Sequence, residues 1–398
     1  MSEIFVSTNF YVNWCYNKKG GVSVILCRIE RQGSSISVNT LGEKSERIVT
    51  VAAFKRILQN EMCLCQNAIL TKDNKLRIVK NRFETIDLQK FVNFKNYGGK
   101  TSNKYGITYN NVDYMVKPAK SGGDFSVISE YVASHFINSF NSKQFSAHET
   151  LLFLDKKQGL VVACKDFTKK GIKLHSYGET GQSSEDTDMT TKIYSYADIC
   201  YSILKHTKLN SDTVKSNMLQ HFWFMFCLDA VLGNRDRNPG NWGYLVRNKG
   251  NYFAAPMYDN AGSLFSDVNR KITEYTRESR RKFILERSYF YPASVLETGN
   301  QAQHRRTNYF DYIAANGLQI KELSNALNYF NSFDVATIKR QITDIIISSE
   351  YIPYKLGYFY IDVVCMRYLM LISGTKMYRQ NMSWEEIQSI LWEKYIRI

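Results

Sequence analysis

Prolines are few in this sequence, and its cysteines and histidines lack the spacings that bind zinc. Only 5 of the 398 residues are proline, and none of the 8 cysteines belongs to a Cys-x2-Cys pair. The 6 histidines form no His-Glu-x-x-His pattern, so a zinc site is not expected. Several cysteines lie in apolar segments, where a free thiol acts as a small hydrophobic group, which indicates a reducing compartment.

Signals for secretion and for membrane insertion are also missing. Residues 1–10 do not have the pattern of a signal peptide. The longest apolar segment, residues 358–373, contains Asp362 and Arg367 and is shorter than a bilayer requires. The sequence therefore predicts a core helix in this segment and a cytoplasmic protein without a membrane span.

Two common nucleotide-binding motifs are absent. Gly99, Lys100 and Thr101 resemble the end of a Walker A loop, but that motif requires a glycine where this chain has Phe94. The kinase pattern Gly-x-Gly-x-x-Gly does not occur either. A Walker A loop is therefore rejected for this segment.

Apolar residues and positive charge are plentiful. Hydrophobic residues make up 44% of the chain, which supports two or three packed units. The net charge of +15 suits nucleic acid or another anionic partner, but a Lys- and Asn-rich composition explains it equally well. Residues 280–282, Arg-Arg-Lys, are a hypothetical contact for an acidic substrate or a phosphorylated loop.

One polar segment carries the strongest functional signal. Asp236 is followed by Asn241 five residues later and by Asp259 after eighteen more. The first spacing matches the catalytic-loop Asp and the metal-binding Asn of protein kinases. In that chemistry Asp236 accepts the proton of the attacking hydroxyl. Asn241 and Asp259 then offer the hard oxygen ligands that Mg²⁺ prefers.

The sequence around this segment predicts how its polar residues meet. An apolar helix over residues 222–232 precedes the loop and gives it a buried base. Strands over residues 242–246 and 252–255 form a hairpin, which places Asp259 opposite Asn241. An Asx-rich turn without function is the ordinary alternative for the loop taken alone.

The preceding part of the chain contains candidates for binding ATP. Lys117 ends an alternating strand over residues 112–118 and is predicted to pair with the α- and β-phosphates. Glu130, on a helix over residues 125–140, is predicted to form an ion pair with Lys117. Taken alone, each would be an ordinary surface charge.

Two further segments complete the predicted nucleotide site. Lys100, Thr101 and Ser102 lie in a glycine-containing loop whose backbone N–H groups can approach phosphate oxygens. A hairpin of residues 151–154 and 160–164 leads into a hinge, where backbone groups near Ala163 and Lys165 are predicted to bind adenine.

In this order the segments resemble the HipA family of serine/threonine kinases. The matching segments, in one-letter code, are YGGKTS at 97–102, DYMVKP at 113–118, SEYV at 129–132, VVACKDF at 161–167, DAVLGNRD at 229–236 and PMYD at 256–259. The resemblance covers roughly residues 90–390, and its last two segments are the most specific.

The resemblance implies an α+β fold of the two-lobed, protein-kinase-like HipA type. A small β-rich N-terminal lobe would span residues 91–167, and a mainly helical C-terminal lobe residues 168–398. Residues 1–90 would form an extra N-terminal α+β subdomain. In this subdomain we expect strands near 22–26, 35–38 and 76–79 and a helix near 51–58. In the larger lobe we expect helices near 192–207, 214–232, 320–331, 334–349, 357–373 and 384–394.

The resemblance also implies cofactors and partners. The cofactors are ATP and Mg²⁺, with Asp236 as the base, Asn241 and Asp259 as metal ligands and Lys117 as the ATP lysine. In bacterial HipA-type systems the kinase is the toxin of a toxin–antitoxin pair and phosphorylates an aminoacyl-tRNA synthetase. A HipB-like helix-turn-helix antitoxin, which binds DNA, restrains it. Family members autophosphorylate on the phosphate loop, where Thr101 and Ser102 are the matching hydroxyls.

One residue departs from the family pattern. The family usually has a histidine two residues after the catalytic Asp, where this chain has Asn238. An amide forms hydrogen bonds and can brace the loop, but it cannot carry the charge of an imidazolium. Two alternatives therefore stay open. One is a lipid or small-molecule kinase of the phosphoinositide-kinase type, which shares the Asp-x4-Asn spacing. The other is an inactive pseudokinase that acts as a binding module.

Overall fold

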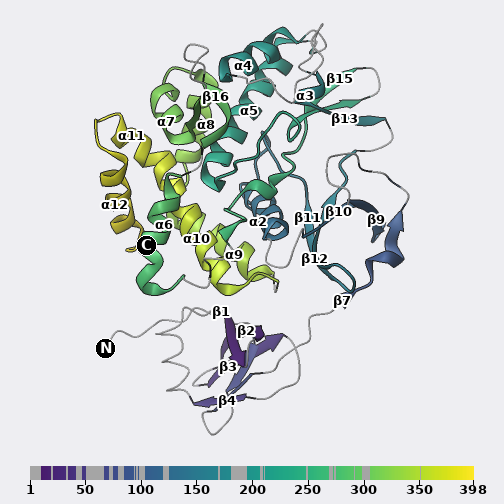
Figure 1. Ribbon diagram of the computed structural model, residues 1–398, viewed down its shortest axis with the longest axis vertical. Helices are drawn as coiled ribbons and strands as arrows, with labels where there is room; N and C mark the ends of the chain where they lie inside the picture. The colour runs from purple at the N-terminus through teal and green to yellow at the C-terminus, as the bar shows by residue number, and fades with distance from the viewer. Residues whose placement is uncertain are drawn as a thin grey trace.

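The computed structural model describes most of the chain from residue 85 onward and separate strands before it (Figure 1). The described residues are 10–18, 21–32, 35–41, 47–50, 67–70, 75–78, 85–93, 95, 97, 104–119, 125–168, 171–180, 195–206, 209, 211–247, 250–268, 272, 275–290, 292–297, 305–349 and 351–398.

The strands before residue 80 form one antiparallel sheet with the order β1-β2-β3-β5-β6-β4. Its strands are β1 (Phe10–Lys18), β2 (Gly21–Gln32), β3 (Ser35–Leu41), β4 (Arg47–Thr50), β5 (Asn67–Leu70) and β6 (Lys75–Ile78). The three strands predicted in this region are confirmed, and the helix predicted near 51–58 lies outside the described residues.

A second six-stranded sheet has the order β7-β11-β12-β10-β9-β8. Its strands are β7 (Thr85–Ile86), β8 (Val92–Asn93), β9 (Tyr105–Tyr109), β10 (Val112–Pro118), β11 (Thr150–Asp155) and β12 (Gly159–Lys165), and the short helix η1 (Leu88–Phe91) joins β7 to β8. All pairs are antiparallel except β7 with β11. Since β7 belongs to this sheet, the sheet begins within the segment that the sequence assigned to the N-terminal subdomain.

Side chains alternate across this sheet and so divide between two cores. Val116, Val161 and Ala163 are buried in a small core on one face. Val162 and Cys164 belong to the large core that also contains residues of helix α2 (Ser126–Ser139). Helix α2 packs against β11 and β12 and is buried along most of its length. This packing sets α2 against the sheet in which β10, the strand that carries Lys117, pairs with β12 (Figure 1).

The rest of the chain is mainly helical. Its helices are α3 (Tyr177–Thr180), α4 (Tyr196–Lys205), α5 (Asp212–Leu232), α6 (Arg277–Ser288), α7 (Tyr309–Asn316), α8 (Lys321–Asn331), α9 (Val335–Ser348), α10 (Tyr354–Leu369), α11 (Thr375–Tyr378) and α12 (Trp384–Tyr395), with the short helices η2 (Asn260–Gly262) and η5 (Met370–Gly374). The six predicted helices are confirmed, whereas α6 and α7 were not predicted.

Two small sheets accompany these helices. β13 (Ile172–Ser176), β14 (Gly243–Arg247) and β15 (Asn251–Ala254) form one, and β16 (Pro292–Glu297) with β17 (Arg305–Asn308) forms the other. The β14–β15 pair is the hairpin predicted after the catalytic loop. It therefore carries the chain from Asn241 to the segment that contains Asp259.

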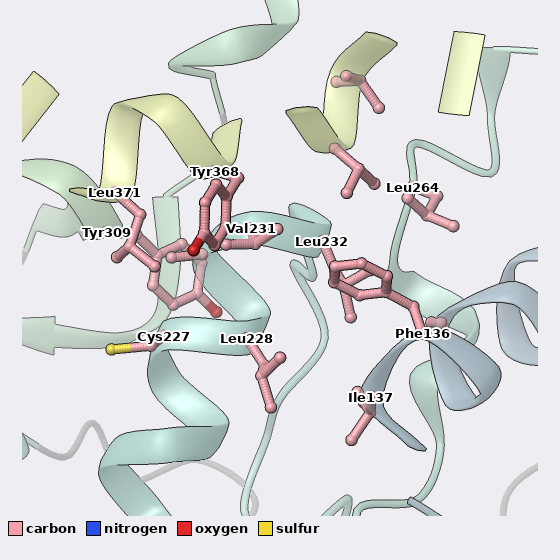
Figure 2. Close-up of a cluster of buried hydrophobic side chains, with 14 of the residues drawn as sticks. Phe136, Ile137, Cys227, Leu228, Val231, Leu232, Leu264, Tyr309, Tyr368 and Leu371 are labelled. Atoms are coloured by element: carbon pink, nitrogen blue, oxygen red, sulfur yellow. The ribbon is translucent and has the colours of Figure 1, made fainter. Parts of the chain in front are cut away.

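Helix α5 is the buried base of the predicted catalytic loop. The Ser211 side chain caps its start by accepting the N–H of Val214 at 3.2 Å. Gly233 ends it with a φ of 62°, where a Cβ would meet the Phe265 ring at 3.0 Å. Figure 2 shows residues of α5 such as Leu228 and Leu232 within the large core, with Phe136 of α2 close by.

Among the described residues, the helical segment Lys355–Tyr378 is long and apolar enough to cross a membrane. However, 83% of its most apolar stretch is buried inside the protein. The core helix predicted at residues 358–373 is therefore confirmed, since α10 and η5 fill the centre of the helical part.

Candidate active site

Hydrogen bonds between side chains and backbone shape the loop after α5. Asn234 accepts the N–H of Asp236 at 3.0 Å, and the Asn238 amide donates to Oδ1 of Asp236, also at 3.0 Å. The Asn238 Oδ1 atom accepts the N–H of Gly240 at 2.9 Å. The side chain in the place of the family histidine thus braces the loop. Asp236 itself is exposed, so its carboxylate is held in direction while remaining accessible to a hydroxyl.

Asn241 is oriented in a way that suits cation binding. Its Nδ2 donates to the backbone oxygen of Asp236 at 2.6 Å and to Oδ2 of the same residue at 3.3 Å. Because Nδ2 is used within the loop, Oδ1 is the amide atom that can bind a cation. The loop therefore joins the predicted base and the predicted neutral metal ligand directly.

Arg237, between these residues, is buried and holds the loop to its surroundings. Its guanidinium donates to both carboxylate oxygens of Asp229 on α5, at 2.9 and 3.0 Å. It also donates to the backbone oxygens of Asn241 at 2.8 Å and Tyr258 at 2.6 Å, and to Oδ1 of Asn260 at 2.7 Å. Burial opposes its charge, but Asp229 outweighs this effect and raises the pKa of Arg237.

Lys117 brings the two halves of the predicted site together. Its Nζ atom lies 3.0 Å from Oε2 of Glu130 and 2.9 Å from Oδ1 of Asp259, which is 142 residues away in the sequence. Burial works against the lysine charge, but the two carboxylates outweigh it and hold its pKa well above the usual value. The structure confirms the predicted Lys117–Glu130 ion pair. The backbone of Asp259 has a φ of 57°, a conformation that few residues other than glycine adopt.

Glu130 is fully buried and receives hydrogen bonds from three directions. Besides Lys117, His148 Nε2 lies 2.8 Å from its Oε1 atom, and the N–H of Asn260 donates to the same atom at 2.8 Å. Burial alone would raise the pKa of Glu130, but Lys117 and His148 lower it below its usual range. Burial opposes protonation of His148, yet the nearby Cys164 and Glu130 raise its pKa to about 9. Glu130, His148 and Cys164 offer ligand atoms within 4.8 Å of one another, and an ion pair already joins the first two.

The predicted hinge residues lie at the end of β12. Ala163 is paired on both sides, with Val116 of β10 and Leu151 of β11. The N–H of Lys165 donates to the Glu149 backbone oxygen at 2.8 Å, and its Nζ atom lies 2.6 Å from the Glu149 carboxylate. These groups are engaged within the sheet and its edge, and their role in binding adenine stays a prediction.

The predicted phosphate-loop residues Lys100, Thr101 and Ser102 lie outside the described residues. The segment just before them is tied to the hinge. The Tyr97 hydroxyl donates to Oδ2 of Asp166 at 2.8 Å, and Lys95 forms an ion pair with the same carboxylate. The start of the loop is therefore anchored directly after β12.

Three buried residues of this site were missed by reasoning from the sequence. Arg237 follows Asp236, the predicted base, and its place between two predicted site residues was an available signal. His148 and Asn260 carried no local signal, because their partners lie on α2.

No protein-family model matches the chain. The serine/threonine-protein kinase CtkA of Helicobacter pylori is 32% identical over 227 residues, which are 55% of this chain and 66% of CtkA. The alignment thus spans just under two thirds of that relative. The crystal structure of the proinflammatory kinase CtkA of Helicobacter pylori matches 74% of this chain and 99% of its own, with 26% identity and a TM-score of 0.57.

These similarities to CtkA support the resemblance to HipA-like kinases that the motifs predict. The chain's α+β, two-lobed kinase-like fold, expected from the motif order, is confirmed. A complex of HipA, HipB and operator DNA from Shewanella oneidensis MR-1 is more distant, with 12% identity and a TM-score of 0.45 over 77% of both chains. Among the described residues, Lys117 contacts Asp259, and the N–H of the next residue, Asn260, donates to Glu130, so the sheet with α2 adjoins the segment after the predicted catalytic loop.

Proposed function

We propose that the chain is an ATP- and Mg²⁺-dependent protein kinase that transfers the γ-phosphoryl group to a serine or threonine hydroxyl. The observation that carries the proposal is the bridge of Lys117 to both Glu130 and Asp259, next to the Asp236–Asn241 loop. Because Lys117 and Asp259 are 142 residues apart in the sequence, a chance turn does not explain their meeting. Kinase catalysis requires this combination of a lysine, a base and oxygen ligands.

The donor set fits the proposed cofactors. Asn241 Oδ1 and the carboxylate of Asp259 are hard oxygen ligands of the kind that Mg²⁺ takes, and Lys117 supplies a cation for phosphate oxygens. When bound, Mg²⁺ neutralises charge that develops on the phosphates during transfer. Lys117 forms an ion pair with Asp259. Asn241 and Asp259 are the residues that would hold the ion.

The chain's own residues would then prepare the acceptor hydroxyl. Asp236 accepts its proton, and Asn238 and Asn241 hold the Asp236 carboxylate through Oδ1 and Oδ2 respectively. This bracing reduces the number of orientations that the base can take, which favours a productive approach. Asn238 therefore orients the Asp236 carboxylate through a hydrogen bond, but it carries no positive charge as a protonated histidine would.

Finer assignments rest on the motif resemblance alone. They are autophosphorylation at Thr101 or Ser102, a toxin role, an aminoacyl-tRNA synthetase substrate and a HipB-like antitoxin that binds DNA. In the Shewanella structure it is HipA that assembles with HipB and operator DNA. Mass spectrometry of the purified chain before and after incubation with Mg²⁺ and ATP tests the first assignment.

The experiment for the main proposal is transfer from radiolabelled ATP, with the chain itself and bacterial proteins as acceptors. We expect Asp236→Asn to reduce transfer by about 10²- to 10⁴-fold, because the base is lost. Asp267→Asn is the control, since Asp267 is an exposed carboxylate paired with Arg235. Equal transfer by wild type and Asp236→Asn would contradict the proposal.

The nature of the labelled product separates the alternatives. Phosphoserine or phosphothreonine in the acceptor supports a protein kinase. Label in a lipid or small-molecule fraction supports the phosphoinositide-type alternative instead. A wild-type chain that transfers no label supports an inactive binding module.

A further inference from the structure

A network of buried polar side chains connects helix α2 to the catalytic loop behind the proposed active site. Glu130 and Ser134 of α2 and Asn260 are fully buried, and Arg237 is 4% exposed. Buried polar groups are costly unless they are hydrogen-bonded, so a connected set of this kind fixes the positions of the segments that carry it.

Asn260, the residue after Asp259, is the centre of this network. Its N–H donates to Oε1 of Glu130 at 2.8 Å, and its Nδ2 donates to Oγ of Ser134 at 3.0 Å. Its Oδ1 atom accepts from Arg237 at 2.7 Å. One residue thus contacts helix α2 through two groups and the catalytic loop through a third.

The chemistry of these contacts suits an asparagine. Glu130 and Ser134 are four residues apart on α2 and therefore lie on the same face of the helix. The amide must accept from a guanidinium on one side and donate to a hydroxyl on the other. An aspartate would keep the first contact but would lose the donor and add a negative charge close to Glu130. An apolar side chain would lose both contacts.

We propose that Asn260 is a positioning residue that links α2 to the catalytic loop, so that the Lys117–Glu130 pair and Asp259 are held in place together. Asp259 immediately precedes it and has a φ of 57°, a conformation that surrounding contacts must maintain. Loss of the link would loosen α2 and shift both partners of Lys117. The link itself follows from geometry, and its effects on ATP binding and on transfer rest on the proposed kinase function.

The decisive variant is Ser134→Ala, which removes one contact of Asn260 and little else. Ser129→Ala is its matched control. Ser129 lies on the same helix and is also fully buried, but its hydroxyl is bonded to Tyr360 at 3.0 Å. Asn260→Ala tests the whole link, and the double variant Asn260→Ala/Ser134→Ala tests whether the two residues act through one contact.

The first measurement is hydrogen–deuterium exchange of residues 126–139, together with Mg²⁺-ATP affinity by calorimetry. We expect Ser134→Ala to speed exchange in the second half of α2 and to weaken ATP binding, each by roughly 2- to 10-fold. Asn260→Ala should have a larger effect, about 10- to 100-fold, because it also removes one of the acceptors of Arg237. The double variant should be no worse than Asn260→Ala alone.

The possible results are distinct. If Ser134→Ala behaves like Ser129→Ala, the proposal is wrong, even if Asn260→Ala does not fold. If Asn260→Ala folds, additive effects in the double variant also contradict the proposal. If the wild type transfers no phosphate but Ser134→Ala still loosens α2, the kinase function fails while the link stands. With an active wild type, we also expect the Michaelis constant for ATP to rise more than kcat falls.

Discussion

Replacing Arg237 with methionine is expected to destabilise the fold more than any exposed charge change in the same loop. The variant keeps an unbranched side chain but loses the guanidinium hydrogen bonds to Asp229, Asn241, Tyr258 and Asn260. Asp229, which is 2% exposed, then keeps the Asn234 amide at 2.9 Å but loses its counter-charge. Breaking a buried ion pair from one side costs about 3–5 kcal/mol, because the other charge stays buried.

This loss is a large part of the stability of an ordinary domain, which is about 5–15 kcal/mol. The matched control is Arg235→Met, two residues earlier. Arg235 Nη1 lies 3.4 Å from the Asp267 carboxylate, and the side chains are 44% and 53% exposed. Exposed pairs are screened by water, so this variant should lose at most about 1 kcal/mol.

Urea unfolding monitored by circular dichroism measures both effects. The double variant Arg237→Met/Asp229→Leu provides a further test, because removing both charges should recover part of the loss. If Arg237→Met unfolds within about 1 kcal/mol of Arg235→Met, the guanidinium does not hold the loop as the contacts indicate. If the double variant is less stable than the single one, the buried charge of Asp229 is not the cause.

Two further predictions concern the same site. The pKa of His148 is raised from 6.5 to about 9, so its protonated form contributes stability that is complete below pH 6.5 and lost as the pH rises to about 9. Thermal unfolding at several pH values should show that the wild type is more stable than His148→Gln by up to about 3 kcal/mol below pH 6.5, and that this difference disappears as the pH rises to about 9. A difference in stability that does not change with pH would contradict the ion pair of His148 with Glu130. Gly262→Ala should lower kcat at least about tenfold, because its Cβ would lie 2.8 Å from Cβ of Asp236 and 2.9 Å from Oδ1 of Asn234. Gly178→Ala is the control in steady-state kinetics, because its Cβ would make an ordinary contact with Pro239 at 3.5 Å. Equal kcat values for Gly262→Ala and Gly178→Ala would show that the loop tolerates the added methyl group at position 262.

Much of the candidate site was predictable because its residues lie in segments whose residue types and spacing are distinctive on their own. Asp236 and Asn241 share one loop, and the pattern of apolar helix, polar loop and hairpin is visible in consecutive residues. Lys117 and Glu130 followed from the alternation of a strand and the periodicity of a helix. In each case the signal lies within one continuous stretch of sequence, where residue type and spacing limit the structure strongly.

The residues that were missed depend on contacts between distant segments. His148 matters because it adjoins Glu130, and Asn260 because it contacts Ser134, 126 residues earlier in the chain. Asparagine and histidine are common in loops, so neither residue type points to a buried position. Helix α6 was also missed because its segment, residues 277–288, is rich in charge and has a weak apolar pattern.

Burial divides the catalytic loop into two kinds of residue. Asp236 and Asn238 are exposed, while Arg237 between them is buried. An exposed side chain that acts on a substrate contributes little to folding, so Asp236→Asn should abolish transfer and leave the unfolding curve unchanged. A buried side chain that holds backbone oxygens contributes to both, so Arg237→Met should lower activity and stability together. Measuring both quantities for adjacent residues therefore separates the chemistry of this loop from the contacts that hold it.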